Sequence, residues 1–296
     1  MRTPPKLGIP ASADPVTAEV RKLLRAAEVG RRLPTPKAQI LACTSLVETG
    51  ELNLEEYERT LSEKASEYFY RAFRKVVGYL DRRTKVIYVD PQLHDLRKIF
   101  VTYHEVIHRV APWQHIVRTE DDDLTLDPAC EELFECEANF GAAEILFQCE
   151  RFEEQARDYD LSVASALHLA TEYEASCHSS LRRFVERNHR PCLLLVVHPT
   201  RRQNADGGRS FFVSHAIPSA GFTLQFGEPF SQPYINPDQE LGRIINSGGG
   251  EMGISDLKGF SRVCVVEPFN NQYRHFAMIY PKDTARSRRR VLLRAS

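Results

Sequence analysis

Residues 99–110 read IFVTYHEVIHRV, and the pattern of this stretch predicts both a helix and a site on it. Its apolar residues recur at helical intervals, which is typical of a helix with one buried face. His104 and His108 are four positions apart, and residues i and i+4 lie on the same face of a helix. The two imidazoles could then hold one metal ion between them. We therefore expect a helix from Leu93 to about Val110 that carries a metal-binding pair.

Glu105 stands directly after the first histidine and completes the pattern HExxH. Imidazole nitrogen is a good zinc ligand, and a zinc ion makes a bound water more acidic. In this pattern the Glu105 carboxylate reaches the water rather than the ion, so we expect it to act as a general base. Two histidines on a helix surface beside a charged residue are the alternative interpretation. The apolar residues around the motif favour the metal site.

A catalytic zinc site needs a third protein ligand and one open position. Residues 131–147 read EELFECEANFGAAEILF and predict a second helix. Glu135 shares a helical face with Ala138 and Ala142, whose small side chains would let the two helices approach closely, whereas Glu137 points about 200° away. We therefore expect Glu135 to be the third ligand. A solvated surface charge is the alternative for any glutamate in so acidic a helix.

Further roles around this site stay open. Asn139 lies on the face of Glu135 and could accept a hydrogen bond from a metal-binding imidazole, or it could only pack. Tyr103 or Tyr173 could donate to a developing oxyanion, and the spacing selects neither. The acidic run TEDDD at 119–123 could engage a basic partner, or it could be an ordinary solvated loop.

The rest of the chain changes character near Pro191. Before it the spacing predicts helices and one strand, and after it short β-like runs alternate with Gly, Asn and Pro clusters. The expected helices cover 16–31, 37–49, 53–80, 130–150 and 151–188, and the strand is 84–90. The later strands are CLLLVVHP, SFFVSHAI, FTLQFG, RVCVVEP and YRHFAMIYP, with a helix near 237–246 and a loop at GGGEMG, residues 248–253. We place a domain boundary near 188–192.

The composition is that of an ordinary globular protein, with 42% hydrophobic and 27% charged residues and a formal net charge of −1. Because no strong positive field is present, we expect no direct binding to nucleic acid. No apolar run approaches the roughly 20 residues that span a bilayer, and the N-terminus lacks the apolar stretch of a signal peptide. The seven cysteines form no CxxC pair, which suits a reducing compartment. We expect a cytoplasmic protein that does not bind membranes.

Three motifs together resemble the ImmA/IrrE family of metallopeptidases. They are IYVD (87–90), HEVIH (104–108) and ECEANFGAA (135–143), and the helical segment at 161–184 is similar to the one that follows the third ligand in that family. The resemblance covers roughly residues 80–185. One departure is that EILFQCE follows GAA, where family members commonly have an aliphatic run ending in Met-Pro.

The resemblance implies zinc ligation by His104, His108 and Glu135, with Glu105 as general base. Members of the family typically cleave helix-turn-helix repressors and so release transcription, often in stress responses. Some carry a GAF-like domain after the peptidase, and residues 190–282 resemble such an appendage in size and periodicity.

We therefore expect an α+β protein with a helical zincin-like core and a small sheet, followed by a β-rich, GAF-like sensory domain. The expected segments are a flexible lead-in at 1–15, the peptidase domain at 16–188, the β-rich domain at 189–283 and a basic tail at 284–296. The expected activity is zinc-dependent limited proteolysis of a protein partner, a helix-turn-helix repressor. The alternative is a regulatory or sensor binding protein with a structural or vestigial metal site.

Overall fold

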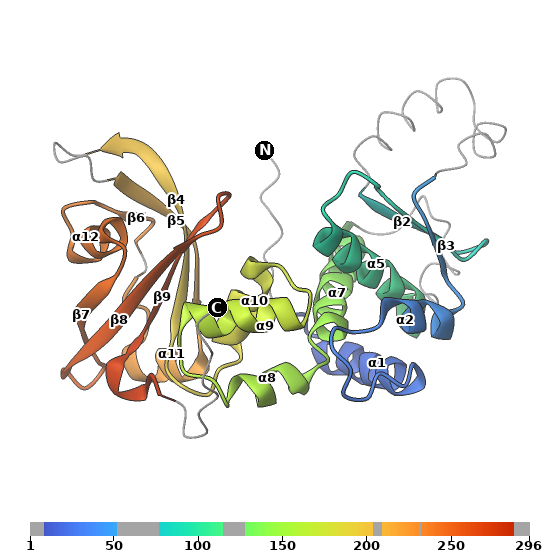
Figure 1. The fold of residues 1–296 in the computed structure, drawn as a ribbon, viewed down its shortest axis with the longest axis horizontal. Coiled ribbons are helices and arrows are strands. Elements are labelled where there is room, and N and C mark those ends of the chain that lie inside the picture. Colours follow the sequence, from blue (N-terminus) through green and yellow to red (C-terminus); the bar gives the residue numbers. More distant parts are fainter. Residues whose placement is uncertain (1–8, 52–76, 115–127, 204–208, 231, 287–296) are drawn as a thin grey trace. The chain divides into compact units, whose positions relative to one another are not determined.

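The computed structural model describes residues 9–51, 77–114, 128–203, 209–230 and 232–286 (Figure 1). The chain forms two compact units, residues 1–149 and 150–296, and each has its own helices and its own sheet. The acidic run at 119–123 and residues 287–296 of the expected basic tail lie outside the described residues. None of the helices among the described residues is long and apolar enough to cross a membrane.

The first unit packs helices against a small sheet. Its strands lie in the order β1-β3-β2, with β1 parallel and β2 antiparallel to β3. The helices are α1 (Ala13–Ala26), α2 (Lys37–Thr44), α5 (Asp95–Val110) and α7 (Pro128–Leu146). The strands are β1 (Val47–Thr49), β2 (Gly78–Asp81) and β3 (Val86–Val89).

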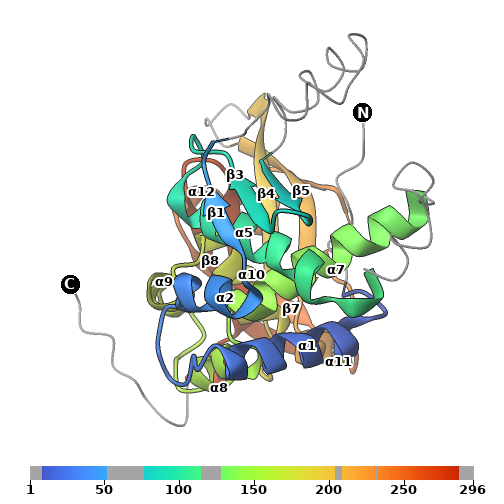
Figure 2. The ribbon, with the colours of Figure 1, turned by 90° about the vertical axis from the view of Figure 1, so that its right-hand side faces the viewer.

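Helix α5 carries the HExxH motif and forms where the apolar spacing predicts it. His94 caps its first turn, because the His94 Nδ1 accepts a hydrogen bond from the Leu96 N–H. Helix α5 lies against α7 (Figure 2), and a Cβ added at Gly141 of α7 would lie 2.5 Å from the Ile107 Cδ1. A glycine at this position therefore lets the two helices approach closely enough to share one site.

Two expected helices of this unit end differently in the structure. The helix expected at 37–49 ends at Thr44, and Val47–Thr49 form β1 instead, because they pair in parallel with β3. Most of the helix expected at 53–80 lies outside the described residues, but its last residues belong to the strand β2. At the N-terminus, α1 begins at Ala13, so the last residues of the expected lead-in at 1–15 are helical.

The second unit is built on a curled, antiparallel half-barrel sheet with the strand order β6-β5-β4-β9-β8-β7 (Figure 1). Its strands are β4 (Leu193–Gln203), β5 (Arg209–Pro218), β6 (Tyr234–Ile235), β7 (Gly250–Ser255), β8 (Ser261–Asn270) and β9 (His275–Pro281). Its helices are α8 (Glu150–Ala156), α9 (Val163–Glu172), α10 (Cys177–Glu186), α11 (Ala220–Phe226) and α12 (Glu240–Ser247), with a 3₁₀ turn at Lys282–Thr284. Apolar residues of α11 and α12 pack with one sheet face into a core.

Two segments of the second unit differ from the expectation. FTLQFG was expected as a strand but lies in α11, where Ser219 caps the helix and Phe222 and Phe226 are buried one turn apart. Leu224, between them, is 81% exposed, as a helix requires. GGGEMG was expected as a loop, but Gly250–Ser255 form β7, because the segment pairs with β8 over its whole length.

The two compact units divide at Cys149, before the predicted boundary near 188–192. The change of periodicity near Pro191 marks the start of the sheet, because β4 begins at Leu193. The preceding helices pack with that sheet: α10 contacts β4 and β5. Arg190 also joins them, since its guanidinium donates to the carbonyls of Tyr159 and Ala285 at 2.7 and 3.2 Å.

Candidate metal centre

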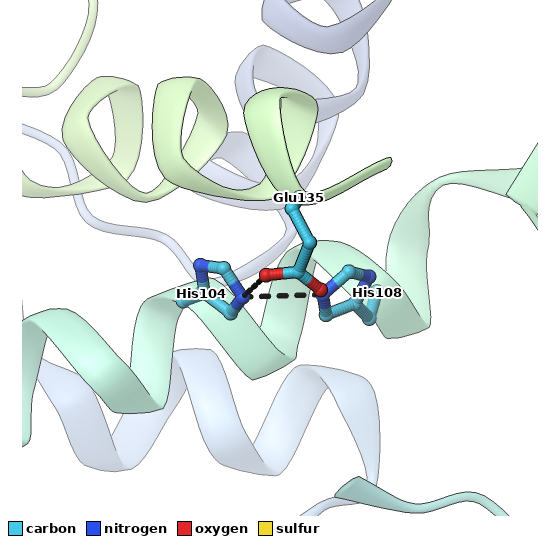
Figure 3. A group of neighbouring side chains, drawn as sticks. All are labelled: His104, His108 and Glu135. Carbon is cyan, nitrogen blue, oxygen red and sulfur yellow. Dashed lines mark hydrogen bonds and ion pairs between the residues drawn. The ribbon is translucent and has the colours of Figure 1, made fainter. Parts of the chain in front are cut away.

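The two histidines of the HExxH motif lie one turn apart on α5. Their Nε2 atoms are 3.2 Å apart, and Figure 3 shows both rings turned toward Glu135 on α7. The Glu135 carboxylate lies between them, with one oxygen 3.2 Å from the His104 Nε2 and the other 3.3 Å from the His108 Nε2. The structure thus brings together the three residues that the sequence predicts as ligands.

The spacing of these atoms fits a single small cation. The candidate ligand atoms of His104, His108 and Glu135 all lie within 4.8 Å of one another. Tetrahedral zinc with bonds of about 2.0–2.1 Å would separate two ligand nitrogens by roughly 3.4 Å, which is close to the observed 3.2 Å. Two imidazoles and one carboxylate are also the ligand set of a common class of catalytic zinc sites. The residues present therefore fit a zinc ion and leave a fourth position for water or substrate.

The outward nitrogens of both histidines meet side-chain amide oxygens. The His104 Nδ1 is 3.2 Å from the Asn139 Oδ1, and the His108 Nδ1 is 2.8 Å from the Gln114 Oε1. An amide oxygen can only accept, so with these partners each Nδ1 would donate its proton and each Nε2 would present a lone pair to a metal ion. Asn139 therefore has the outer role that the sequence left open, and Gln114 is a partner that the sequence analysis missed.

The charges of the site also favour a cation. Burial lowers the pKa of His104, but the hydrogen bond to Glu135 and the charges of Glu105 and Glu135 outweigh it, so this pKa lies above its ordinary value. Burial raises the pKa of Glu135, yet its contacts with both histidines hold that pKa well below the usual range. The carboxylates therefore favour a positive charge beside His104.

A cleft of about 550 Å³ opens in front of these residues. Glu105 lines it and is only 8% exposed, so this carboxylate lies beside the three ligands and is shielded from bulk water. Strand β2 forms another wall through Gly78, Tyr79 and Leu80. A Cβ at Gly78 would lie 2.2 Å from the Val101 Cγ1, so glycine is required for β2 to come this close to α5.

Neither tyrosine suggested for oxyanion stabilisation lines this cleft. Tyr103 is fully buried, and its hydroxyl donates to the Thr35 carbonyl at 3.0 Å. Tyr173 belongs to the second unit, and its hydroxyl donates to the Gln155 Oε1 at 3.0 Å. The cleft instead contains Tyr79 together with Arg82 and Arg97. Tyr79 could not be predicted here because residues 53–80 read as a helix, and the spacing of Arg82 and Arg97 gives no sign that they face the metal ligands.

The geometry agrees with what a comparison with protein families finds. Residues 58–185 match the model of the IrrE N-terminal-like domain, from the M78 peptidase family. Residues 58–185 are an IrrE N-terminal-like domain. This confirms the resemblance that the motifs predict and extends it toward the N-terminus. The matched region contains α5, α7 and the three candidate ligands, so the candidate metal site lies inside it.

A solved structure described as a Mycobacterium tuberculosis transcriptional regulator has a similar fold. The TM-score is 0.52 at 12% sequence identity, and the match covers 92% of this chain and 77% of that one. At this identity the likeness concerns the fold alone. A comparison with curated proteins found no match.

Proposed function

We propose that this protein is a zinc-dependent endopeptidase that cuts a protein partner at one or a few sites. The observation that carries the proposal is the convergence of His104, His108 and Glu135 on one point of a cleft that Glu105 also lines. A structural zinc site would be closed by a fourth protein ligand. Among the described residues, the group of candidate ligands has three members, which leaves one position for chemistry.

Different residues would hold the metal, transfer the proton and orient the substrate during hydrolysis. His104, His108 and Glu135 would hold the zinc ion, with the two Nδ1–H groups donating outward so that both Nε2 lone pairs face inward. When bound, zinc acts as a Lewis acid that polarises a peptide carbonyl and makes water acidic. Glu105 takes the proton from the attacking water and returns it to the leaving amine. Arg82 and Arg97 line the cleft and could orient the substrate backbone.

The wall formed by β2 supports a protein substrate bound in an extended form. Strand β2 is the last strand in the order β1-β3-β2, and its residues Gly78 to Leu80 line the cleft. An extended peptide can add to the edge of a sheet through main-chain hydrogen bonds. Such a peptide would pass in front of Glu105 and the metal ligands, which suits cleavage within a chain.

The substrate that we propose is a helix-turn-helix repressor, and the support for it is the family resemblance. The acidic residues at 119–123 could attract such a basic partner, although they lie outside the described residues. We propose a cytoplasmic location as well, and all seven cysteines are free thiols, as a reducing compartment requires. Residues 189–283, which we propose as a GAF-like sensory domain, would then regulate cleavage.

A regulatory binding protein without peptidase activity is the second candidate function. It is supported by the solved structure with a similar fold, which is described as a transcriptional regulator. The two functions differ in what they require of Glu105. Catalysis needs its carboxylate, whereas binding does not.

The test compares wild type, Glu105→Gln and Glu131→Gln. Glu131 also lines the cleft, but it is not among the candidate ligands, so its variant controls for the loss of one carboxylate. Each protein is mixed with a candidate helix-turn-helix repressor, with and without chelator, and cleavage is followed by mass spectrometry. We expect Glu105→Gln to keep zinc and to lose about 10²–10⁴-fold in cleavage rate. Full complementation of a deletion strain by Glu105→Gln would contradict the proposal.

A further inference from the structure

Glu137 is a carboxylate that the sequence places away from the metal, and the structure buries it. Its side chain is on α7 and only 1% of the residue is exposed. One oxygen accepts from the Trp113 Nε1–H at 2.8 Å and from the Gln114 Nε2–H at 2.7 Å. The other oxygen accepts from the Ser12 hydroxyl. A buried carboxylate is costly, so these donors must offset its loss of water.

The contact between Glu137 and Gln114 fixes the direction of the Gln114 amide. The indole N–H can only donate, so the shared Glu137 oxygen is an acceptor. Gln114 must therefore turn its NH₂ group toward Glu137, which leaves its Oε1 facing the His108 Nδ1 at 2.8 Å. Gln114 is completely buried, so solvent offers no alternative partner for either end of the amide.

We infer that Glu137 is a positioning residue for the metal site, which acts on His108 through Gln114. The chain Glu137–Gln114–His108 holds the proton on the His108 Nδ1 and so directs the Nε2 lone pair toward Glu135 and the metal position. The inference rests on the proposed zinc site. Partners that orient a ligand in this way typically change metal affinity by about 10–100-fold.

The segment at the start of the first unit also contacts the Glu137 carboxylate. Ser12 directly precedes α1, and its hydroxyl contact with Glu137 links this segment to the metal site across 125 positions of sequence. Trp113 lies just after α5, which ends at Val110, and its Nε1–H donates to the other oxygen of the same carboxylate. Since both act only on the carboxylate, removing the Ser12 hydroxyl should weaken zinc binding less than changing Glu137 or Gln114.

The test measures zinc affinity of the full chain by chelator competition, for wild type, Glu137→Met and Gln114→Met, because methionine at 137 removes the oxygen that accepts from Gln114. Glu144→Met is the control, because Glu144 is also buried on α7 and lies seven residues further along it. We expect each of the first two variants to bind zinc about 10–100-fold more weakly, and the control to bind like wild type. The double variant should lose no more than either single variant, because both residues act in one chain.

The tautomer of His108 tests the same inference without a substitution. In zinc-free wild-type protein, at a pH where His108 is neutral, ¹⁵N NMR should show the proton on Nδ1. A neutral His108 with its proton on Nε2 would overturn the inference, as would folded Glu137→Met and Gln114→Met variants with zinc affinities within about twofold of wild type. A wild-type protein that binds no zinc would instead refute the proposed function, and the NMR result would still decide the role of Glu137.

Discussion

Two regions of the molecule gather histidines, and their surroundings are opposite. In the first unit, His104 and His108 face Glu135 and lie beside Glu105. In the second unit, histidines of α10 and the sheet lie near arginines. These are His178, His198, His215 and His275, with Arg182, Arg209 and Arg274. The comparison shows that the sign of the neighbouring charge distinguishes a cation site from a group of histidines.

The pKa values show the difference directly. The pKa of His104 is above its ordinary value despite burial, because carboxylates stabilise its charged form. Burial, together with the charges of Arg274 and Arg182, lowers the pKa of His178 to about 4. A metal ion is a cation like a proton, so the surroundings that oppose protonation of His178 also oppose metal binding there.

The largest effect should come from the residue that makes the first region acidic. Glu135→Gln removes both the charge and a ligand, so zinc affinity should fall by more than the roughly 100-fold expected for an outer partner. Glu132→Gln, on the same helix, is the control, and Glu137→Met should lie between the two. Chelator competition measures all three. If Glu135→Gln kept wild-type affinity while Glu137→Met lost the metal, the register assigned to α7 would be wrong.

A smaller effect should follow from separating the two helices that carry the site. In Gly141→Ala the new methyl group would lie 2.5 Å from the Ile107 Cδ1 and 3.0 Å from the Val16 Cγ1. Such overpacking typically costs about 1–3 kcal/mol, so the urea midpoint should fall and zinc should bind more weakly. A Cβ added at Gly259 would meet open space, but the positive φ of Gly259 would strain any other residue, so it is a poor control. The control is Ala129→Gly, in the first turn of α7, which avoids this strain. Unchanged stability and zinc affinity in Gly141→Ala would show that close helix packing is not needed.

The smallest expected effect is on the pKa of His178, in the second region. NMR titration should give His178 a pKa of about 4. Because this value lies below the unfolded value of about 6.5, the unfolded chain binds the proton more readily, and His178 lowers stability as the pH falls from about 6.5 toward 4. Arg274→Gln should raise the pKa of His178, whereas Arg243→Gln on α12 should leave it unchanged. A pKa near 6.5 in wild type would remove the contrast between the two regions.

The sequence predicts that the three candidate ligands lie together, because the place of each depends on helical spacing within one segment. His104 and His108 are one turn apart, and Glu135 follows from the small residues on its face of α7. Gln114 could not be found this way, because its role depends on Glu137 in another helix. The sequence does not show whether a glutamate is buried or solvated, so the burial of Glu137 could not be predicted.

The errors in the fold have the same cause. Val47–Thr49 and Gly250–Ser255 become strands through pairing with β3 and β8, which local periodicity does not reveal. FTLQFG fits both periods, since residues four apart share a face in a helix and in a strand. The Ser219 cap and the exposed Leu224 distinguish them only in the structure.

The most direct test of the metal centre is to locate zinc in crystals of the zinc-loaded protein by anomalous scattering at the zinc edge. We predict one peak bounded by the Nε2 atoms of His104 and His108 and by the Glu135 carboxylate, with distances of about 2.0–2.2 Å. His104→Ala and His108→Ala should abolish it, and His178→Ala should not. A zinc-loaded wild-type crystal without this peak, or with zinc bound among the histidines of the second unit, would contradict the account.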